Sequence, residues 1–263
     1  MSAITPGTAV DPVRFWSSLR LDRLARPRIA TLALAATGLF SLYFLLFPGV
    51  DVGVSAAFHT AGEGFALSSD PALRALRKSS TIVLGLILLG VIGRIVFRLI
   101  ARRSLGRDLR RGGFLLIGLA VGPGLLVNTV LKGLWGRPRP VHTEMFGGDT
   151  PYVPVWQISD WCQSNCSFVS GEASSAAWLV AAAWVLCPPA WRPWALPLAV
   201  AYGVALSLNR LAFGGHFLSD ILLSWSLMGL VLAVLYPVLI AAPTTVRRRL
   251  RRTRGLTPGL SPA

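Results

Sequence analysis

The chain has 263 residues, of which 53% are hydrophobic and only 14% are charged, and its mean hydropathy is +0.59. These values lie well outside the usual range of soluble globular domains and indicate a polytopic membrane protein. The net charge of +15 comes mostly from arginines beside apolar segments, a placement that favours membrane topology over nucleic-acid binding.

Six segments satisfy the requirements of a membrane-spanning helix, which needs about 20 mostly apolar residues at a rise of about 1.5 Å each. In the second segment, Arg94, Arg98 and Arg102 recur every four residues, and snorkelling to the interface accounts for this stripe. The fourth segment is short, so its Ser-rich start is expected at or near a polar site. The six segments are residues 29–48, 80–99, 114–131, 172–187, 194–212 and 220–240.

Arginines are concentrated in three flanking segments: before the first span, between the second and third spans, and after the sixth span. With six spans these segments share one side of the membrane, which should be the cytoplasm. The loops at about 49–79, 132–171 and 213–219 then face outward, and a loop as long as 132–171 between spans is often functional.

We therefore expect an all-α polytopic membrane protein with six transmembrane helices in one bundle. Residues 1–28 would be a basic cytoplasmic segment, residues 29–241 the six-helix membrane domain, and residues 242–263 a basic cytoplasmic tail. The N-terminus does not predict a secretory signal, because polar, Pro- and Arg-bearing residues precede the first apolar run.

The segment KGLWGRPRP, at the outer end of the third span, carries Lys132 and, seven residues later, Arg139 between two prolines. Lys132 is one of only two lysines in a chain that otherwise uses arginine. A point-charge Lys and a forked Arg together suit the oxygens of a phosphate group. The alternative, an interfacial basic cluster, predicts cytoplasmic placement, whereas this segment is predicted to lie outside.

The segment SFVSGEASS precedes the apolar run of the fourth span. Ser170 and Gly171 are expected at a helix N-terminus, where free backbone N–H groups and the helix dipole attract an anion. Ordinary helix capping is the alternative, with Ser170 as the N-cap and Glu172 as a charge at the positive end of the dipole.

The segment NRLAFGGHFLSD joins the fifth and sixth spans. His216 and Asp220 are four residues apart and share a helical face if the sixth span begins near His216. Asp220 could then accept a hydrogen bond from one imidazole nitrogen and leave the other free to attack. Arg210 and a Gly-Gly pair that permits close backbone approach strengthen this interpretation, although a His-x3-Asp pair alone is weak evidence.

Together the three segments resemble the type 2 phosphatidic acid phosphatase superfamily, whose motifs read K-x6-RP, PSGH and SR-x5-H-x3-D. The first and third motifs keep the ionic residues of the family at its spacings, with Asn209 where the family usually has Ser. The second motif departs twice, with Val169 in place of Pro and Glu172 in place of His. The matching residues of the first and third motifs are Lys132, Arg139, Pro140, Arg210, His216 and Asp220.

The resemblance implies six helices, a site on the outer side and chemistry that requires no metal or other cofactor. His216 would attack phosphorus to give a phosphohistidine that water hydrolyses, and Asp220 would be its orienting partner. The residues that would hold the phosphate and stabilise the transition state are Lys132, Arg139, Ser170, Gly171 and Arg210.

Glu172 stands where the family's histidine would protonate the departing oxygen. A Glu can act as general acid only if its pKa rises from about 4.3 toward the operating pH. A dianionic phosphate nearby would raise that pKa, whereas the surrounding cations and the helix dipole would lower it. We expect that Glu172 still donates the proton, or that the leaving group is good enough to need little help.

Cys162 and Cys166 flank the second motif on the expected outer side of the membrane. They could form a disulfide that braces the loop presenting Ser170, or remain as two free thiols. Metal binding is less favoured because no histidine lies near them in sequence.

The sequence thus predicts a lipid phosphatase of the bacterial inner membrane type, with its site facing the periplasm and a phosphorylated membrane lipid as its partner. The substrates that the resemblance allows are lipid A, undecaprenyl diphosphate and phosphatidylglycerol phosphate, and the segment SFVSGEAS is most similar to the lipid A phosphatase branch. Two alternatives remain: a lipid-to-lipid phosphotransferase, and a non-catalytic pseudoenzyme that binds phospholipid. Nucleic acid is not expected as a partner.

Overall fold

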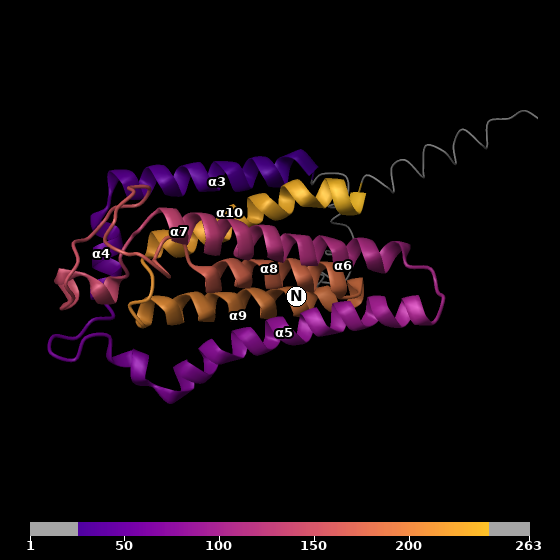
Figure 1. Cartoon of the computed structure of the whole chain (residues 1–263), viewed down its shortest axis with the longest axis horizontal. Coiled ribbons are helices and arrows are strands. Elements are labelled where there is room, and N and C mark those ends of the chain that lie inside the picture. The colour runs from indigo at the N-terminus through magenta and orange to yellow at the C-terminus, as the bar shows by residue number, and fades with distance from the viewer. Residues whose placement is uncertain (1–25, 242–263) are drawn as a thin grey trace, which may run out of the picture.

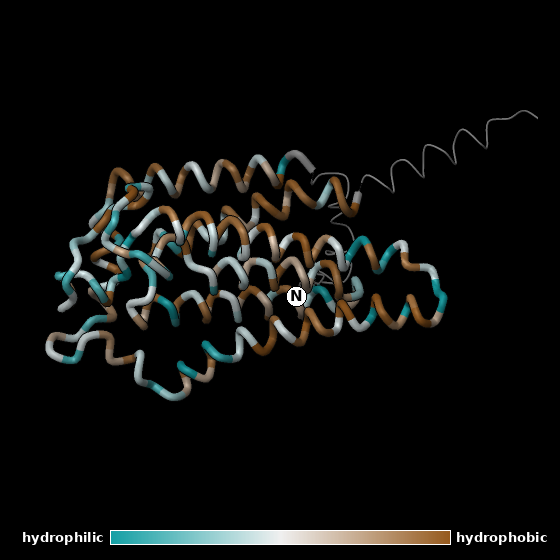
Figure 2. The backbone as a smooth tube through the Cα atoms, viewed as in Figure 1, coloured by the Kyte–Doolittle hydropathy of each residue, from teal (hydrophilic) through white to brown (hydrophobic). Residues whose placement is uncertain are grey.

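Apolar helices run along one common axis in the computed structural model, which describes residues 26–241 (Figure 1). Figure 2 shows hydrophobic residues along the middle of these helices and hydrophilic residues gathered in the loops at the two ends. The first 25 residues of the predicted N-terminal segment and the predicted tail at 242–263 lie outside the described residues.

The observed helices overlap the predicted spans, and the all-α prediction is confirmed. Five helices in the described part of the chain are long and apolar enough to cross a membrane, and α8 is a shorter apolar helix of 16 residues. A count of six spans therefore stays a prediction. The helices are α3 (Arg26–Leu46), α5 (Pro71–Ile100), α6 (Gly106–Leu119) continued by the π-helix η2 (Ala120–Leu131) and α7 (Lys132–Leu134), α8 (Gly171–Leu186), α9 (Arg192–Ala212), and α10 (Leu218–Tyr236) continued by η6 (Pro237–Ala241).

The second span begins earlier than predicted, at Pro71 rather than near residue 80. Asp70 caps this helix, because its side chain accepts a hydrogen bond from the backbone N–H of Leu73 at 2.8 Å, and proline suits the first helical turn. The 30 residues of α5 are about 45 Å long, which exceeds the roughly 30 Å of a bilayer core. The first turns of α5 therefore carry polar side chains, including Arg77, beyond the apolar run.

Short elements fill the loops. The segment predicted as an outer loop at 49–79 contains the helix α4 (Gly49–Ala56), which places Asp51 in the interior. The other short elements are the 3-10 helices η1 (Ala66–Ser69), η3 (Pro140–His142), η4 (Glu144–Phe146) and η5 (Pro189–Trp191).

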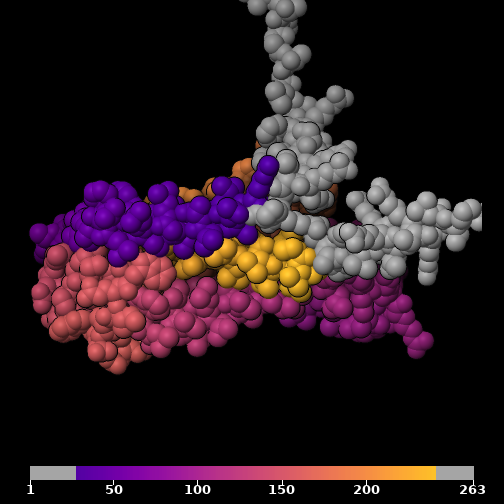
Figure 3. All heavy atoms as spheres, turned by 90° about the horizontal axis from the view of Figure 1, so that it is seen from above, coloured from indigo at the N-terminus to yellow at the C-terminus, as the bar shows by residue number. Residues whose placement is uncertain are grey.

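The helix α8 lies at the centre of the bundle and packs against α6, α9 and α10. Small residues allow this close approach: a Cβ at Gly203 of α9 would come within 3.2 Å of Ala176 of α8. The buried Trp178 of α8 donates its indole N–H to the carbonyl of Leu115 in α6 at 2.8 Å. The helix α3 lies along α10, as Figure 3 shows from above. The N-terminus of α8 lies at the end of the bundle where the three motifs meet.

Candidate active site

The residues of the three motifs lie at one end of the bundle. Lys132 begins α7, Ser170 precedes α8, and Arg210 is in the last turn of α9. His216 lies in the loop between α9 and α10, and Asp220 lies in the first turn of α10. Helix ends that are far apart in sequence thus present their polar residues to one common region (Figure 1).

The imidazole of His216 is fully buried and has a defined orientation. Its Nδ1 lies 2.7 Å from the carbonyl oxygen of Ser167. A carbonyl oxygen can only accept, so in the neutral ring Nδ1 carries the proton and Nε2 keeps its lone pair. Nε2 has no hydrogen-bond partner among the described residues and lies 3.7 Å from Oε2 of Glu172. This nitrogen is free to act as a nucleophile.

Asp220 does not make the direct hydrogen bond to His216 that the sequence led us to expect. Its Oδ2 lies 3.8 Å from Nδ1, which is too long for a hydrogen bond. The same oxygen accepts from the hydroxyl of Ser167 at 2.5 Å and from the backbone N–H of Phe217 at 2.9 Å. Asp220 therefore orients the imidazole through Ser167, whose carbonyl holds the ring.

Asp220 belongs to a buried ionic network that the sequence did not lead us to expect. Arg137 is fully buried and donates hydrogen bonds to Asp220 at 2.6 Å and to Asp51 at 2.8 Å. Burial acts to lower the pKa of Arg137, but the carboxylates of Asp220 and Asp51 outweigh it and hold that pKa above its usual value. Asp51 could have indicated this network, because an acidic residue in an apolar segment needs a cationic or hydrogen-bonding partner.

The cations of the motifs surround Glu172. Arg210 is buried, and its Nε lies 3.4 Å from Oε1 of Glu172. Lys132 is buried too, and a Cβ built at Gly171 would lie 3.5 Å from its Nζ. Gly215 makes room for Arg210, because a Cβ there would come within 2.2 Å of the guanidinium. Of the Gly-Gly pair that was expected to let backbone approach a ligand, Gly215 thus contacts Arg210, whereas Gly214 packs against Phe65.

Arg77 of α5 is a further cation at this site, and no motif indicated it. Its Nε lies 3.6 Å from Oε1 of Glu172, and its side chain is 49% exposed. Glu172 itself is partly exposed and lies within ion-pair distance of Arg77, Arg210 and His216. Only the early start of α5 brings Arg77 to this position.

Ser170 is the N-cap of α8, as the capping interpretation predicted. Its hydroxyl accepts from the backbone N–H of Ala173 at 3.3 Å, and its carbonyl accepts from the hydroxyl of Ser224 at 2.8 Å. The backbone N–H of Ser170 donates to the carbonyl of Asp220 at 3.3 Å. These bonds tie the start of α8 to α10 and so fix Glu172 relative to His216.

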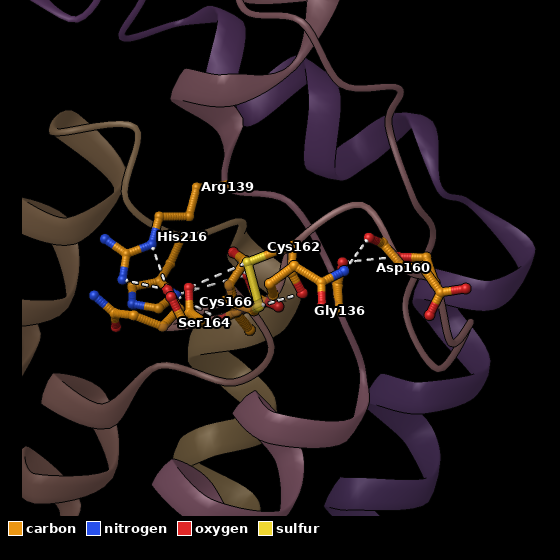
Figure 4. The surroundings of a disulfide bond; sticks show 12 residues. Gly136, Arg139, Asp160, Cys162, Ser164, Cys166 and His216 are labelled. Carbon is orange, nitrogen blue, oxygen red and sulfur yellow. Dashed lines mark hydrogen bonds and ion pairs between the residues drawn. A yellow bond between two sulfur atoms is a disulfide. The ribbon is translucent and has the colours of Figure 1, made fainter.

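A disulfide joins Cys162 and Cys166, whose Cα atoms are 5.7 Å apart. It closes a small loop that contains Asn165, and Figure 4 shows this loop in the neighbourhood of Arg139 and His216. The carbonyl of Asn165 accepts two hydrogen bonds from the guanidinium of Arg139, at 2.8 and 3.1 Å. Burial lowers the pKa of Arg139. The charge of Arg77 lowers this pKa further, whereas the charge of Glu172 acts to raise it. The disulfide loop thus positions one of the predicted phosphate ligands.

A cavity of about 270 Å³ adjoins the cations and extends along α8 away from the loops. Lys132 and Glu172 line it, together with neutral polar side chains from α5, η2 and α8 and with apolar side chains farther along the helices. The polar residues are Ser80, Thr81, Asn128 and Ser175, and the apolar ones include Leu84, Leu179 and Leu206. Across residues 26–241, no group of three or more His, Cys, Asp and Glu side chains could hold a metal ion.

Comparison with known proteins gives concordant results. Residues 113–242 match the model of the PAP2 superfamily. A lipid A 4'-phosphatase of Francisella tularensis subsp. novicida is 35% identical over 188 residues, which cover 68% of this chain and 82% of that protein. Lipid A 4'-phosphatases of Rhizobium etli and Rhizobium leguminosarum are 47% and 48% identical, over matches that span only 41% and 46% of their own lengths. No solved structure matches the chain.

Proposed function

The chain belongs to the PAP2 superfamily, and on this premise we propose that it is a membrane phosphatase that removes phosphate from a lipid, with lipid A as the preferred substrate. The observation that carries the proposal is the free Nε2 of His216, which lies 3.7 Å from Glu172, a carboxylate that is itself within ion-pair distance of Arg77 and Arg210. The names of the relatives support lipid A as the substrate.

In the proposed mechanism, Nε2 of His216 attacks phosphorus and the bond between phosphorus and the lipid oxygen breaks. The product is a phosphohistidine, and water then cleaves its P–N bond and releases inorganic phosphate. The proton on Nδ1 stays hydrogen-bonded to the carbonyl of Ser167, which stabilises positive charge on the ring as the new bond forms.

Lys132, Arg139 and Arg210 stabilise the negative charge on the phosphoryl oxygens in the transition state. Two of them are positioned before the substrate arrives: Arg139 by the carbonyl of Asn165 and Arg210 by Glu172. Such preorganised donors commonly contribute about 3 kcal/mol each to lowering the barrier.

We assign to Glu172 the protonation of the departing lipid oxygen. In the structure its carboxylate lies within ion-pair distance of Arg77 and Arg210, and no other acid among the described residues contacts these two arginines. A bound phosphate group would compete for these cations, and Glu172 would then be better able to carry a proton. The distance of 3.7 Å between its Oε2 and Nε2 of His216 supports this assignment.

The cavity along α8 would hold the part of the substrate next to the phosphate. Its hydroxyl and amide side chains suit a headgroup with hydroxyl or amide groups, and its apolar side chains suit the lipid portion. This gradient from charged to neutral polar to apolar fits a phosphorylated glycolipid that enters from the bilayer.

We also propose that the site faces the periplasm from the bacterial inner membrane. The arginine-rich loop between α5 and α6 lies at the opposite end of the bundle from the candidate active site (Figure 1). The positive-inside rule puts such a loop in the cytoplasm, and the phosphatase site then lies outside.

Purified protein and a panel of phosphorylated lipids test the proposed function. We expect release of inorganic phosphate from lipid A and its loss in a His216→Ala variant that unfolds at the same temperature as the parent. The proposal fails if lipid A binds without any release of phosphate, which is the behaviour of a pseudoenzyme. Phosphate recovered on an added acceptor lipid, with little in solution, would instead indicate a phosphotransferase.

A further inference from the structure

A second and larger cavity, of about 630 Å³, lies at the other end of the bundle. It is formed by the last turns of α5 and α8 and the first turns of α6 and α9. The whole length of α8, 16 residues or about 24 Å, separates it from Ser170. The cavity is therefore independent of the candidate active site.

Four arginines from three different helices line this cavity, with a single acid among them. They are Arg94 of α5, Arg107 and Arg111 of α6, and Arg192 of α9; the acid is Asp108. Asp108 is already bound by two arginines, since Arg94 contacts it at 2.9 Å and Arg98 at 2.8 Å. Among the described residues, the other three arginines lie beyond ion-pair distance of any carboxylate, and Asp108 is the one acid whose charge acts on Arg111.

Arg111 and Arg107 are the unsatisfied members of this group. Among the described residues, neither guanidinium makes a hydrogen bond or an ion pair, although Arg111 is only half-exposed. Arg192 is held differently, because its guanidinium lies 4.3 Å from the ring centroid of Trp184 and its Nε donates to the carbonyl of Cys187. Five N–H donors on each of Arg107 and Arg111 are thus available to an incoming anion.

The walls of the cavity between these cations and the middle of the bundle are apolar. Ile87, Val91 and Ile95 of α5 form one wall, and Leu186 of α8 contributes to another. Close packing of α6 on α5 closes the deep end, since a Cβ at Gly112 would come within 2.7 Å of Ile95. A ligand that fills the cavity must present negative charge at one end and hydrocarbon at the other.

We propose that this cavity binds an anionic phospholipid, with its phosphate at Arg107 and Arg111 and one acyl chain along Ile87, Val91 and Ile95. Arginine forks match phosphate oxygens, and basic pockets between transmembrane helices hold anionic headgroups. Topology alone requires only that arginines stand at the membrane surface. It does not require that arginines from three helices converge on one cavity, or that two of them, Arg107 and Arg111, make no hydrogen bond with the described residues.

The bound lipid stabilises the native bundle, because a ligand that binds only the folded state raises its stability. It bridges α6, which contributes Arg107 and Arg111, and α5, which contributes the apolar wall. The effect does not depend on phosphatase activity, so the lipid site is tested separately from the proposed function.

The test uses the full chain in a neutral detergent and measures its unfolding temperature and the lipid it retains in native mass spectrometry. The probes are phosphatidylglycerol, phosphatidylcholine with the same acyl chains, glycerol phosphate and inorganic phosphate. We expect phosphatidylglycerol alone to raise the unfolding temperature and to be retained as a one-to-one complex. Equal effects of phosphatidylcholine, or of either free phosphate, would overturn the proposal.

The variants Arg111→Gln and Arg107→Gln should each weaken phosphatidylglycerol binding about tenfold or more. Arg107 is exposed, so its replacement leaves the packing intact even if the loss of Arg111 impairs folding. Arg103→Gln is the matched control, because Arg103 is exposed at the same end of the bundle and does not line the cavity. An equal loss in Arg103→Gln would show general attraction of anionic lipid to basic charge and would refute a defined site.

Discussion

Nδ1 of His216 lies 2.7 Å from the carbonyl oxygen of Ser167, and this contact decides which nitrogen can react. Because the carbonyl requires a proton on Nδ1, the lone pair of the neutral ring is on Nε2, on the side of Glu172. Ser167 in turn is held through its hydroxyl by Asp220. The His-x3-Asp spacing predicted that Asp220 orients His216 directly. In the structure Ser167, which lies outside that motif, connects the two side chains.

Replacing Asp220 by Asn should reduce both stability and activity. The variant weakens the pairing of buried Arg137 and the bond to Ser167, and breaking a buried pair costs roughly 3 to 5 kcal/mol when one partner is removed. We expect a lower denaturation midpoint and a fall in kcat that exceeds the loss of folded protein.

Asp51→Asn is the control for that experiment, because Asp51 binds the other side of Arg137 and does not contact His216 or Ser167. It should lower stability by a comparable amount and leave kcat of the folded fraction near that of the parent. Equal losses of kcat in the two variants would mean that the network acts on activity only through folding.

Glu172→Gln tests the protonation of the departing oxygen. Loss of a general acid commonly costs about 100- to 10,000-fold in rate, and the loss should be largest for poor leaving groups. We expect kcat to fall steeply on a lipid phosphomonoester and much less on a lipid diphosphate. Full activity of the variant on monoesters would eliminate this role for Glu172.

Arg77→Gln should raise KM more than it lowers kcat. Arg77 lies at the exposed rim of the site and contacts Glu172 at 3.6 Å, so its charge attracts the substrate phosphate without being buried beside phosphorus. A rise in KM of about threefold to tenfold, weaker at high salt, is expected. Arg74→Gln is the matched control one turn earlier on α5, where the side chain contacts the carbonyl of Ser68; a similar rise there would exclude a specific role for Arg77.

Removing the disulfide with Cys162→Ser should loosen the loop that holds Arg139. Closing so short a loop contributes about 2 kcal/mol in the chain-entropy account. The expected result is a lower unfolding temperature and weaker phosphate binding, measured as a higher inhibition constant for inorganic phosphate. Cys187→Ser, a change at the other end of α8, should alter neither quantity. Unchanged phosphate inhibition in Cys162→Ser would show that Arg139 does not need the disulfide.

Asn128→Ala tests the cavity along α8 as the headgroup site. Asn128 lines this cavity and is one turn from Lys132, so loss of its amide should remove about one hydrogen bond to the substrate. We expect KM for lipid A to rise about fivefold and KM for phosphatidic acid, which has a small headgroup, to stay constant. The same rise for both lipids would assign Asn128 to the phosphate rather than to the headgroup.

Hydropathy and motif spacing predicted much of the fold. A run of about 20 apolar residues has few alternatives to a spanning helix, because the bilayer satisfies no backbone polar group. The apolar runs therefore appear as helices at the predicted places. The early start of α5 was missed, because the cap at Asp70 is a local signal that lies outside the apolar run.

The positions of Lys132, Arg210, His216 and Asp220 at one end of the bundle follow from the sequence alone, because each stands at the end of an apolar run and the runs alternate in direction. What only the tertiary structure decided is how these side chains pair. Arg137 meets Asp51 across 86 positions of sequence, and Arg77 reaches Glu172 from another helix. Local spacing specifies which end of a helix a residue occupies. Which charges neutralise each other in a buried, low-dielectric interior depends on how the helices pack, and that is a property of the whole chain.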